Sequence, residues 1–135
     1  MSMDYLQYMA EMEMGEPSLK EDLDAAENSL GIVFPAEYRR FMLKTNGAEG
    51  SIGKSNYLVI WPVEEIVELN EEYGVAEFTP GLIYFGSDGG GMAYAFDVRE
   101  EVTRFVRFPF DSIHIEDEEI VATVFNDFIK ALYDD

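Results

Sequence analysis

The order in which helical and extended segments follow one another constrains the fold of this chain most strongly. Pro and Gly residues separate segments with apolar residues at helical spacing from short β-branched and aromatic runs. This pattern predicts helices over residues 19–30, from Pro35 to Asn46, from Pro62 to Gly74, and from Asp117 to near the end of the chain. It predicts strands over residues 57–61, 82–85, 92–96 and 104–108, with a further short one near 113–115.

This order of elements predicts an α+β fold rather than a doubly wound parallel sheet. We expect a mainly antiparallel or mixed sheet of about four to six strands, flanked by about four helices. The chain has 135 residues, which is the usual size of one domain. We assign residues 18–135 to this single domain and residues 1–17 to an N-terminal extension.

The N-terminal extension has two possible structures. It could form a short helix that packs Leu6 and Met9 onto the domain, or a mobile tail. It lacks the basic region and the apolar run of a secretory signal, and no apolar run in the chain approaches the ~20 residues that span a membrane. We therefore expect a cytoplasmic protein. Directly after the extension, Ser18 and Glu21 predict a capping box for the first helix.

The acidity of the chain constrains its partners. It holds 28 Asp and Glu against 9 Lys and Arg, and residues 63–81 contain acids but no base. A field of this sign repels nucleic acids and anionic membranes and attracts cations. We therefore expect a basic protein partner and neither nucleic acid nor membrane. Solubility or a high-salt habitat are the alternative explanations of the charge.

Most of the common catalytic and metal-binding motifs are missing. The chain has no Cys and a single His, which removes thiol nucleophiles, disulfides and the usual zinc motifs. We assign no role to His114, and the acidic run over residues 116–119 lacks the spacing of a calcium-binding loop. We predict no catalytic residue, cofactor or metal. A carboxylate-based enzyme stays an alternative, although no sequence feature selects a pair among so many acids.

A glycine-rich segment, Gly-Ser-Asp-Gly-Gly-Gly, covers residues 86–91. Such loops bind phosphate when they follow a strand and open a helix. Here the next residues have the pattern of a strand, and no Lys follows the glycines. The pattern therefore favours a hairpin turn with positive φ angles.

Three groups of residues form the most distinctive pattern of the chain. They are Leu30, Gly31, Phe34, Pro35, Tyr38 and Phe41; then residues 61–66 with Asn70; and then residues 85–97, followed by Phe125 and Phe128. In order and spacing, over residues 18–133, this pattern resembles the SUKH superfamily. Met92 departs from it, because related sequences often have an acidic residue after the glycines.

The resemblance implies a single α+β domain without enzymatic activity. Bacterial members of the superfamily are largely inferred to be immunity proteins that neutralise polymorphic toxins, many of them nucleases, and the fungal namesakes are cell-wall assembly regulators. Together with the charge, this predicts a non-enzymatic protein that occludes a basic toxin domain. An intracellular scaffold or regulator related to the fungal proteins is the alternative.

The predicted binding surface combines a loop, a strand residue and helix acids. It comprises Ser87, Asp88, Gly89, Gly90 and Gly91, then Tyr94, and then Glu65, Glu68 and Glu72. Tyr57 and Trp61 are further candidates if they prove exposed, because aromatic anchors carry much of the energy of protein interfaces. The alternative is that both aromatic residues belong to the core. The sequence leaves the oligomeric state open.

Overall fold

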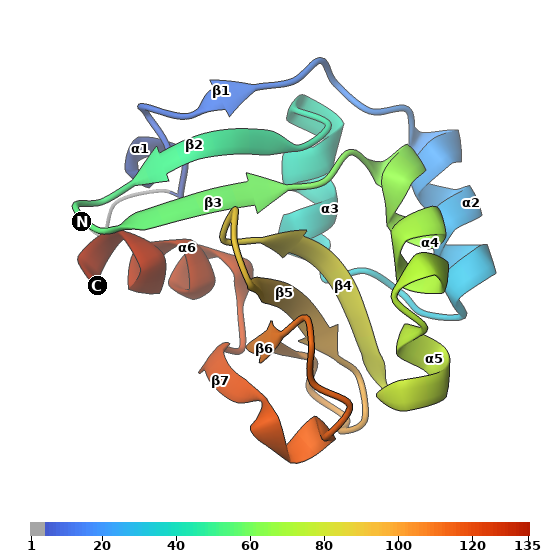
Figure 1. Ribbon diagram of the computed structural model, residues 1–135. Helices are drawn as coiled ribbons and strands as arrows, with labels where there is room; N and C mark the ends of the chain where they lie inside the picture. Colours follow the sequence, from blue (N-terminus) through green and yellow to red (C-terminus); the bar gives the residue numbers. More distant parts are fainter. Residues whose placement is uncertain (1–4) are drawn as a thin grey trace.

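The computed structural model of the protein describes residues 5–135 and shows an antiparallel sheet whose strands are adjacent in sequence order (Figure 1). Over these residues the sheet has seven strands: β1 (Glu13–Met14), β2 (Ala48–Ile52), β3 (Asn56–Ile60), β4 (Leu82–Ser87), β5 (Met92–Asp97), β6 (Arg104–Pro109) and β7 (Glu119–Ala122). The α-helices of the same residues are α1 (Tyr5–Tyr8), α2 (Lys20–Leu30), α3 (Ala36–Lys44), α4 (Val63–Glu72), α5 (Val75–Phe78) and α6 (Phe125–Asp134), and a short 3-10 helix, η1, covers Ile115–Asp117. The predicted α+β class is confirmed, but the predicted numbers of strands and helices were too low.

The main core lies between one face of the sheet and the helices α3 and α6. Phe85 of β4 stacks on Phe96 of β5 with ring centroids 4.4 Å apart, and both rings are fully buried. Tyr38 of α3 and Phe128 of α6 meet these rings edge to face at 4.9 to 5.7 Å. Aromatic pairs of this geometry add to the free energy of burial, so the aromatic residues of the chain hold sheet and helices together.

A second aromatic cluster lies on the opposite face of the sheet. Its members are Trp61, Tyr73, Tyr84, Phe108 and Phe110. Tyr84 and Phe85 are neighbours on β4, and their side chains serve these two different clusters. Because successive strand residues point to opposite faces, the run predicted as one buried strand supplies aromatic rings to both sides of the sheet.

Strand β4 has a bulge between Tyr84 and Gly86, and Asn70 of α4 pairs with the backbone there. The Asn70 amide donates to the carbonyl of Tyr84 at 2.9 Å and accepts from its N–H at 2.8 Å. Gly86 passes so close to β3 that a Cβ atom would stand 2.2 Å from the carbonyl oxygen of Val59. The bulge therefore depends on one buried amide and on one residue without a side chain.

The region before α6 differs from the prediction of a helix starting at Asp117. Residues 119–122 form β7 and pair with β6, and α6 begins only at Phe125. Ile120 and Val121 fit a strand as well as a helix by their spacing, and the open edge of β6 supplies a hydrogen-bonding partner that local pattern cannot reveal. The short strand expected near 113–115 is also absent, because η1 begins at Ile115.

The predicted capping box is wrong. The N-cap of α2 is Leu19, and the Ser18 hydroxyl donates instead to the carbonyl of Met42 at the end of α3. Ser18 thus joins two helices rather than starting one.

The segment before α2 packs on the domain. Tyr5, Tyr8, Met9 and Met12 are buried, and the Tyr5 ring lies 5.2 Å from that of Phe125. The first four residues of the predicted extension, 1–17, lie outside the described residues. Strands β1 and β2, neither of which was predicted, join this segment to the sheet through the pairs Glu13 with Glu49 and Met14 with Ala48.

Candidate functional site

A groove of about 480 Å³ lies between the β1–β2 edge and the beginning of α4. We call it the acidic groove, because Glu13 of β1, Glu49 of β2 and Glu65 of α4 line it and no Lys or Arg does. Val59 and Trp61 also line it. A groove lined by both apolar residues and carboxylates suits the stem and the charged end of a Lys or Arg side chain.

Asn46 holds the two sides of the acidic groove in place. Its side-chain oxygen accepts from the backbone N–H of Val63 at 2.8 Å, and its amide nitrogen donates to both carboxylate oxygens of Glu64. Gly47, with φ of 91°, passes so close to β3 that a Cβ atom would stand 2.5 Å from the carbonyl oxygen of Ile60. The Asn46-Gly47 pair, predicted as a helix end, therefore also anchors the start of α4.

Tyr57 of β3 is exposed, and its ring lies against the tip of the glycine-rich loop. The residue is 38% exposed, and a Cβ atom on Gly89 would stand 2.8 Å from its ring. The Tyr57 hydroxyl donates to Glu49 at 2.6 Å. This bond, together with partial burial and the charges of Glu49 and Glu13, raises the pKa of Tyr57. The phenol is thus a neutral donor bound to a carboxylate of the acidic groove.

The glycine-rich loop satisfies its own backbone groups. The Asp88 carboxylate accepts from the N–H groups of Gly90 at 2.8 Å and Met92 at 3.2 Å, and the Ser87 hydroxyl accepts from Gly89 at 3.1 Å. Ser87 and Asp88 therefore shape the loop, while Gly89, Gly90 and Gly91 form its exposed tip. Because the N–H groups of Gly89, Gly90 and Met92 point to side chains of the loop itself, they do not form a phosphate cradle.

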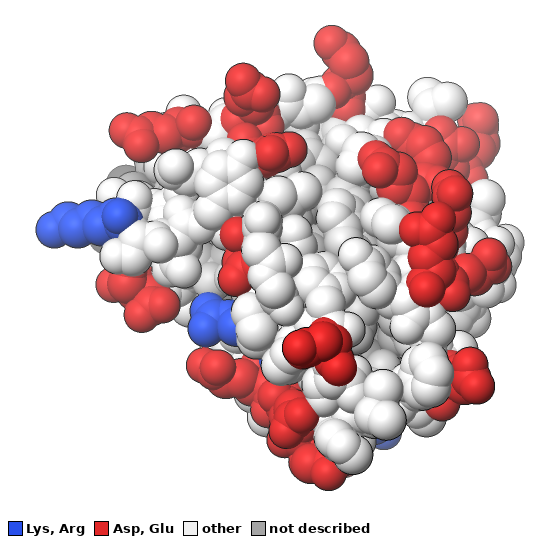
Figure 2. Space-filling view, in the orientation of Figure 1, with Lys and Arg blue, Asp and Glu red and all other residues white. Residues whose placement is uncertain are grey.

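The exposed glutamates of α4 have no basic partner among residues 5–135. These are Glu64, Glu65, Glu68, Glu71 and Glu72. The described ion pairs of Lys and Arg all lie on other elements. Figure 2 shows acidic side chains gathered on the α4 side of the molecule and along the edge above β2, around a largely uncharged centre. The negative charge is therefore grouped and uncompensated on this side.

Two of the predicted aromatic candidates contribute little surface. Tyr94 is 1% exposed and packs edge to face on Phe128 on the core side of the sheet. Trp61 is 8% exposed, and its ring belongs to the second aromatic cluster through Phe110. Of the three aromatic candidates, Tyr57 alone has an exposed side chain.

The other predicted residues fall into two neighbouring groups. The loop tip contacts Tyr57, and Glu65 shares the acidic groove with Trp61. Glu68 and Glu72 continue along α4 away from the groove. Sequence reasoning missed Glu13 and Glu49, because the strands that carry them have no alternating apolar pattern to mark them.

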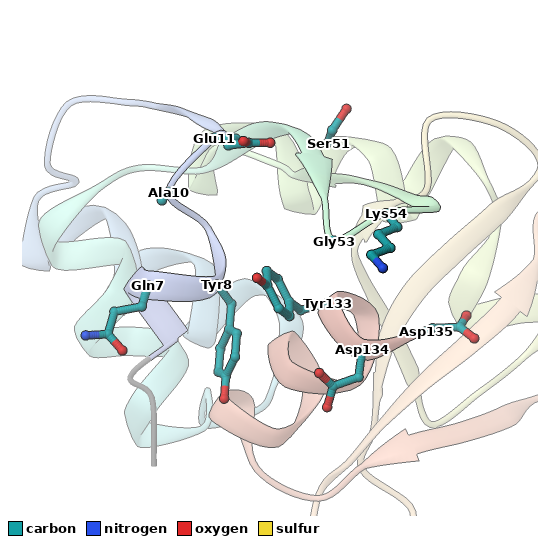
Figure 3. A pocket seen from close by; sticks show the side chains of 10 residues that line it. All are labelled: Gln7, Tyr8, Ala10, Glu11, Ser51, Gly53, Lys54, Tyr133, Asp134 and Asp135. Atoms are coloured by element: carbon teal, nitrogen blue, oxygen red, sulfur yellow. The ribbon is translucent and has the colours of Figure 1, made fainter. Parts of the chain in front are cut away.

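A separate hollow of about 450 Å³ lies among α1, the turn after β2 and the end of α6 (Figure 3). The rings of Tyr8 and Tyr133 lie side by side in it, 4.9 Å apart. Lys54 and the carboxylates of Asp134 and Asp135 line the same hollow. Because it mixes both charges, it suits a basic partner less well than the α4 side.

Within residues 5–135 no set of His, Asp and Glu side chains is arranged to hold a metal ion. None of the helices in this range has the length and apolar character that crossing a membrane requires. His114 is exposed, with Glu116 at 3.9 Å. The closely spaced carboxylates of Asp97 and Glu118 are both engaged by arginines, and Asp97 is fully buried, so they offer no open catalytic pair.

Comparison with known proteins relates the chain to one family. The model of the SMI1 / KNR4 family (SUKH-1) matches residues 17–131. The Bacillus subtilis (strain 168) protein "Uncharacterized protein YnaB" is 32% identical over 71 residues. These residues cover 53% of this chain and 44% of that relative, so the match spans less than half of the relative's length.

Proposed function

From the premise that this chain belongs to the SMI1 / KNR4 (SUKH-1) family, we propose that it is a non-enzymatic, immunity-type protein that neutralises a basic toxin domain by covering it. The family assignment supports a protein-binding role. The toxin as partner and occlusion as mechanism are inferred from the charge and the surface described above.

The uncompensated glutamates of α4 carry this proposal. Glu68 lies four residues from both Glu64 and Glu72, and like charges at this spacing weaken a helix by about 0.2–0.5 kcal/mol per pair. Six of the nine Lys and Arg residues form ion pairs on other elements. The glutamates of α4 therefore keep their mutual repulsion and are well suited to bind Lys and Arg side chains of a partner protein. Binding a basic surface would relieve this repulsion.

A nuclease is the kind of toxin that fits this surface best. It grips a phosphate backbone with Lys and Arg, so its substrate-binding surface is basic. An acidic protein accelerates encounter with such a surface and also covers the residues that hold the substrate. In this mechanism the α4 glutamates and the acidic groove meet the cations, and the exposed loop tip with Tyr57 adds uncharged contact.

Co-expression with the products of neighbouring genes that prove toxic on their own tests the proposal. We expect protected growth and a stable complex of the two proteins on size-exclusion chromatography, with association that slows as salt is added. An unrelated basic protein of similar charge is the control and should not be retained at physiological salt. Protection without detectable complex would contradict occlusion. Capture of a host cell-wall factor without any protection would favour the scaffold function instead.

A further inference from the structure

A second groove, of about 650 Å³, lies on the other side of α4, between the end of α2, the helix α5 and the start of β4. We call it the apolar groove. The side chains that line it include Leu30, Ile32, Val67, Ala76, Ile83 and Val98. Ala76 is exposed and the other five are only half-buried, although such residues are usually found fully inside. The groove therefore presents apolar surface that no part of residues 5–135 covers.

The turn between α4 and α5 lines this groove. Its Gly74 precedes α5 with φ of 64°, and the ring of Phe78 lies against it. Phe78 itself stays 48% exposed at this position. A side chain on Gly74 would be strained in this conformation, so the backbone itself sets the separation between α5 and its neighbours.

The rim of the apolar groove is acidic. Glu71 of α4 and Glu77 of α5 line it, and the described ion pairs include neither. No Lys or Arg lines the groove. An occupant must therefore combine an apolar side chain with neighbouring positive charge. A second copy of this chain fits poorly, because its net charge of -19 would repel an equal charge at this rim.

We propose that the apolar groove receives a Leu- or Phe-sized side chain of a basic protein partner, while a Lys or Arg beside it in the partner meets Glu71 and Glu77. This inference rests on the proposed function. It assigns two steps of partner binding to two different surfaces. The α4 glutamates accelerate encounter, and the apolar groove anchors the partner, as a buried centre with a charged rim does in other interfaces.

Three short peptides test the anchor without any toxin. They are acetyl-Lys-Leu-Phe-Lys-amide, acetyl-Lys-Ser-Ser-Lys-amide and acetyl-Glu-Leu-Phe-Glu-amide, each titrated into the full-length ¹⁵N-labelled protein and followed by NMR. We expect the first peptide to shift the amide signals of Val67, Ala76 and Ile83. The other two should bind at least about tenfold more weakly, because each lacks one half of the required chemistry.

A matched pair of variants locates the site. Ala76→Gln places a polar side chain in the groove without changing the charge, and it should weaken the Lys-Leu-Phe-Lys peptide about tenfold. Ala25→Gln makes the same change on an exposed position of α2 that does not line the groove, and should leave binding unchanged. Circular dichroism checks that both variants fold.

The outcomes separate this inference from the proposed function. Equal binding of the Lys-Leu-Phe-Lys and Lys-Ser-Ser-Lys peptides, with shifts along the α4 glutamates alone, would overturn the anchor and show a purely electrostatic surface. Equal shifts in the groove from the Lys-Leu-Phe-Lys and Glu-Leu-Phe-Glu peptides would show apolar binding without recognition of charge and would also overturn it. A toxin complex that survives Ala76→Gln unchanged would remove the anchor but leave occlusion standing. Specific binding of the Lys-Leu-Phe-Lys peptide without protection against the toxin would support the anchor and contradict the proposed function.

Discussion

Asp97 and Arg104 stand opposite each other on β5 and β6, with Oδ2 and Nη2 2.6 Å apart. Asp97 has no exposed side-chain surface, and Arg99 reaches the same carboxylate with Nε at 3.0 Å and Nη2 at 2.8 Å. Glu118, just before β7, also accepts from Arg99 at 2.8 Å. The two arginines and two carboxylates thus connect β5 and β6 to the segment that leads into β7.

Replacing Asp97 should destabilise the protein strongly. Asp97→Asn removes the fully buried carboxylate and leaves the partly exposed Arg99 and Arg104 with Glu118 as their remaining charge partner. The loss should therefore lie toward the lower end of the about 3–5 kcal/mol that breaking a buried ion pair on one side costs. Urea denaturation measures this loss in the free energy of unfolding. Glu119→Gln is the control, because its ion pair with Arg107 is long at 3.8 Å and the Glu119 side chain is 66% exposed, so it should cost about 0–1 kcal/mol. Equal losses in the two variants would contradict a special role for the buried network.

The same network should make stability depend on pH. Burial and the hydrogen-bonded, charged Asp97 raise the pKa of Glu118. Burial alone would raise the pKa of Asp97, but the hydrogen bonds from the side chain and backbone of Arg99 outweigh it and lower that pKa. The favourable contribution of Glu118 is therefore present below its unfolded pKa of about 4.3 and lost as pH rises through the folded value. The favourable contribution of Asp97 is present above its unfolded pKa of about 3.9. It is lost as the pH falls from there through the lowered folded pKa.

The variant Glu118→Gln isolates the contribution of Glu118 to the pH dependence of stability. The free energy of unfolding of the variant minus that of the parent should increase between about pH 4 and pH 7, because only the parent loses the Glu118 contribution over this range. Denaturation at several pH values measures the slope. Glu116→Gln, an exposed neighbour, is the control. A slope of equal size for both variants would refute the assignment to Glu118.

Neutralising α4 should change stability and binding in opposite directions. In the combined variant Glu65→Gln, Glu68→Gln and Glu72→Gln, fewer like charges repel along the helix, so the free energy of unfolding should rise by up to about 1 kcal/mol. The association rate with the toxin should fall roughly tenfold at low salt, and less at high salt. Stopped-flow fluorescence measures this rate. Neutralising Glu100, Glu101 and Glu116 instead removes the same charge elsewhere, and an equal fall in rate would show that net charge alone matters.

The glycines of the loop should differ in their tolerance of substitution. Gly86→Ala forces a Cβ atom toward the carbonyl of Val59 and should cost about 1–3 kcal/mol or more, whereas Gly91→Ala meets no atom within 4 Å and should leave stability nearly unchanged. Thermal unfolding compares the two. Because Gly91→Ala leaves the fold intact, a weaker toxin complex in that variant would place the loop tip in the interface. Similar destabilisation by both would contradict the packing described at Gly86.

The acidity, the α+β class, the central helices and the β4–β5 hairpin follow from the sequence alone. Their patterns are local: Pro35 and Pro62 precede helices whose apolar residues recur at helical spacing, and the glycines after Phe85 mark a turn. The exposed glutamates of α4 were predicted for the same reason, because a helix with one apolar face exposes the other.

Tertiary structure alone decided what depends on neighbours distant in sequence. Ile120 joins a strand because the edge of β6 is open to it, and β2 forms because β3 pairs with it despite a weak strand pattern. Tyr57 and Tyr94 are both strand tyrosines, yet one is exposed and the other buried, because α3 and α6 cover only one face of the sheet. The grooves on either side of α4 likewise arise from segments far apart along the chain. Periodicity reports which residues share a face, and only packing decides which face meets solvent.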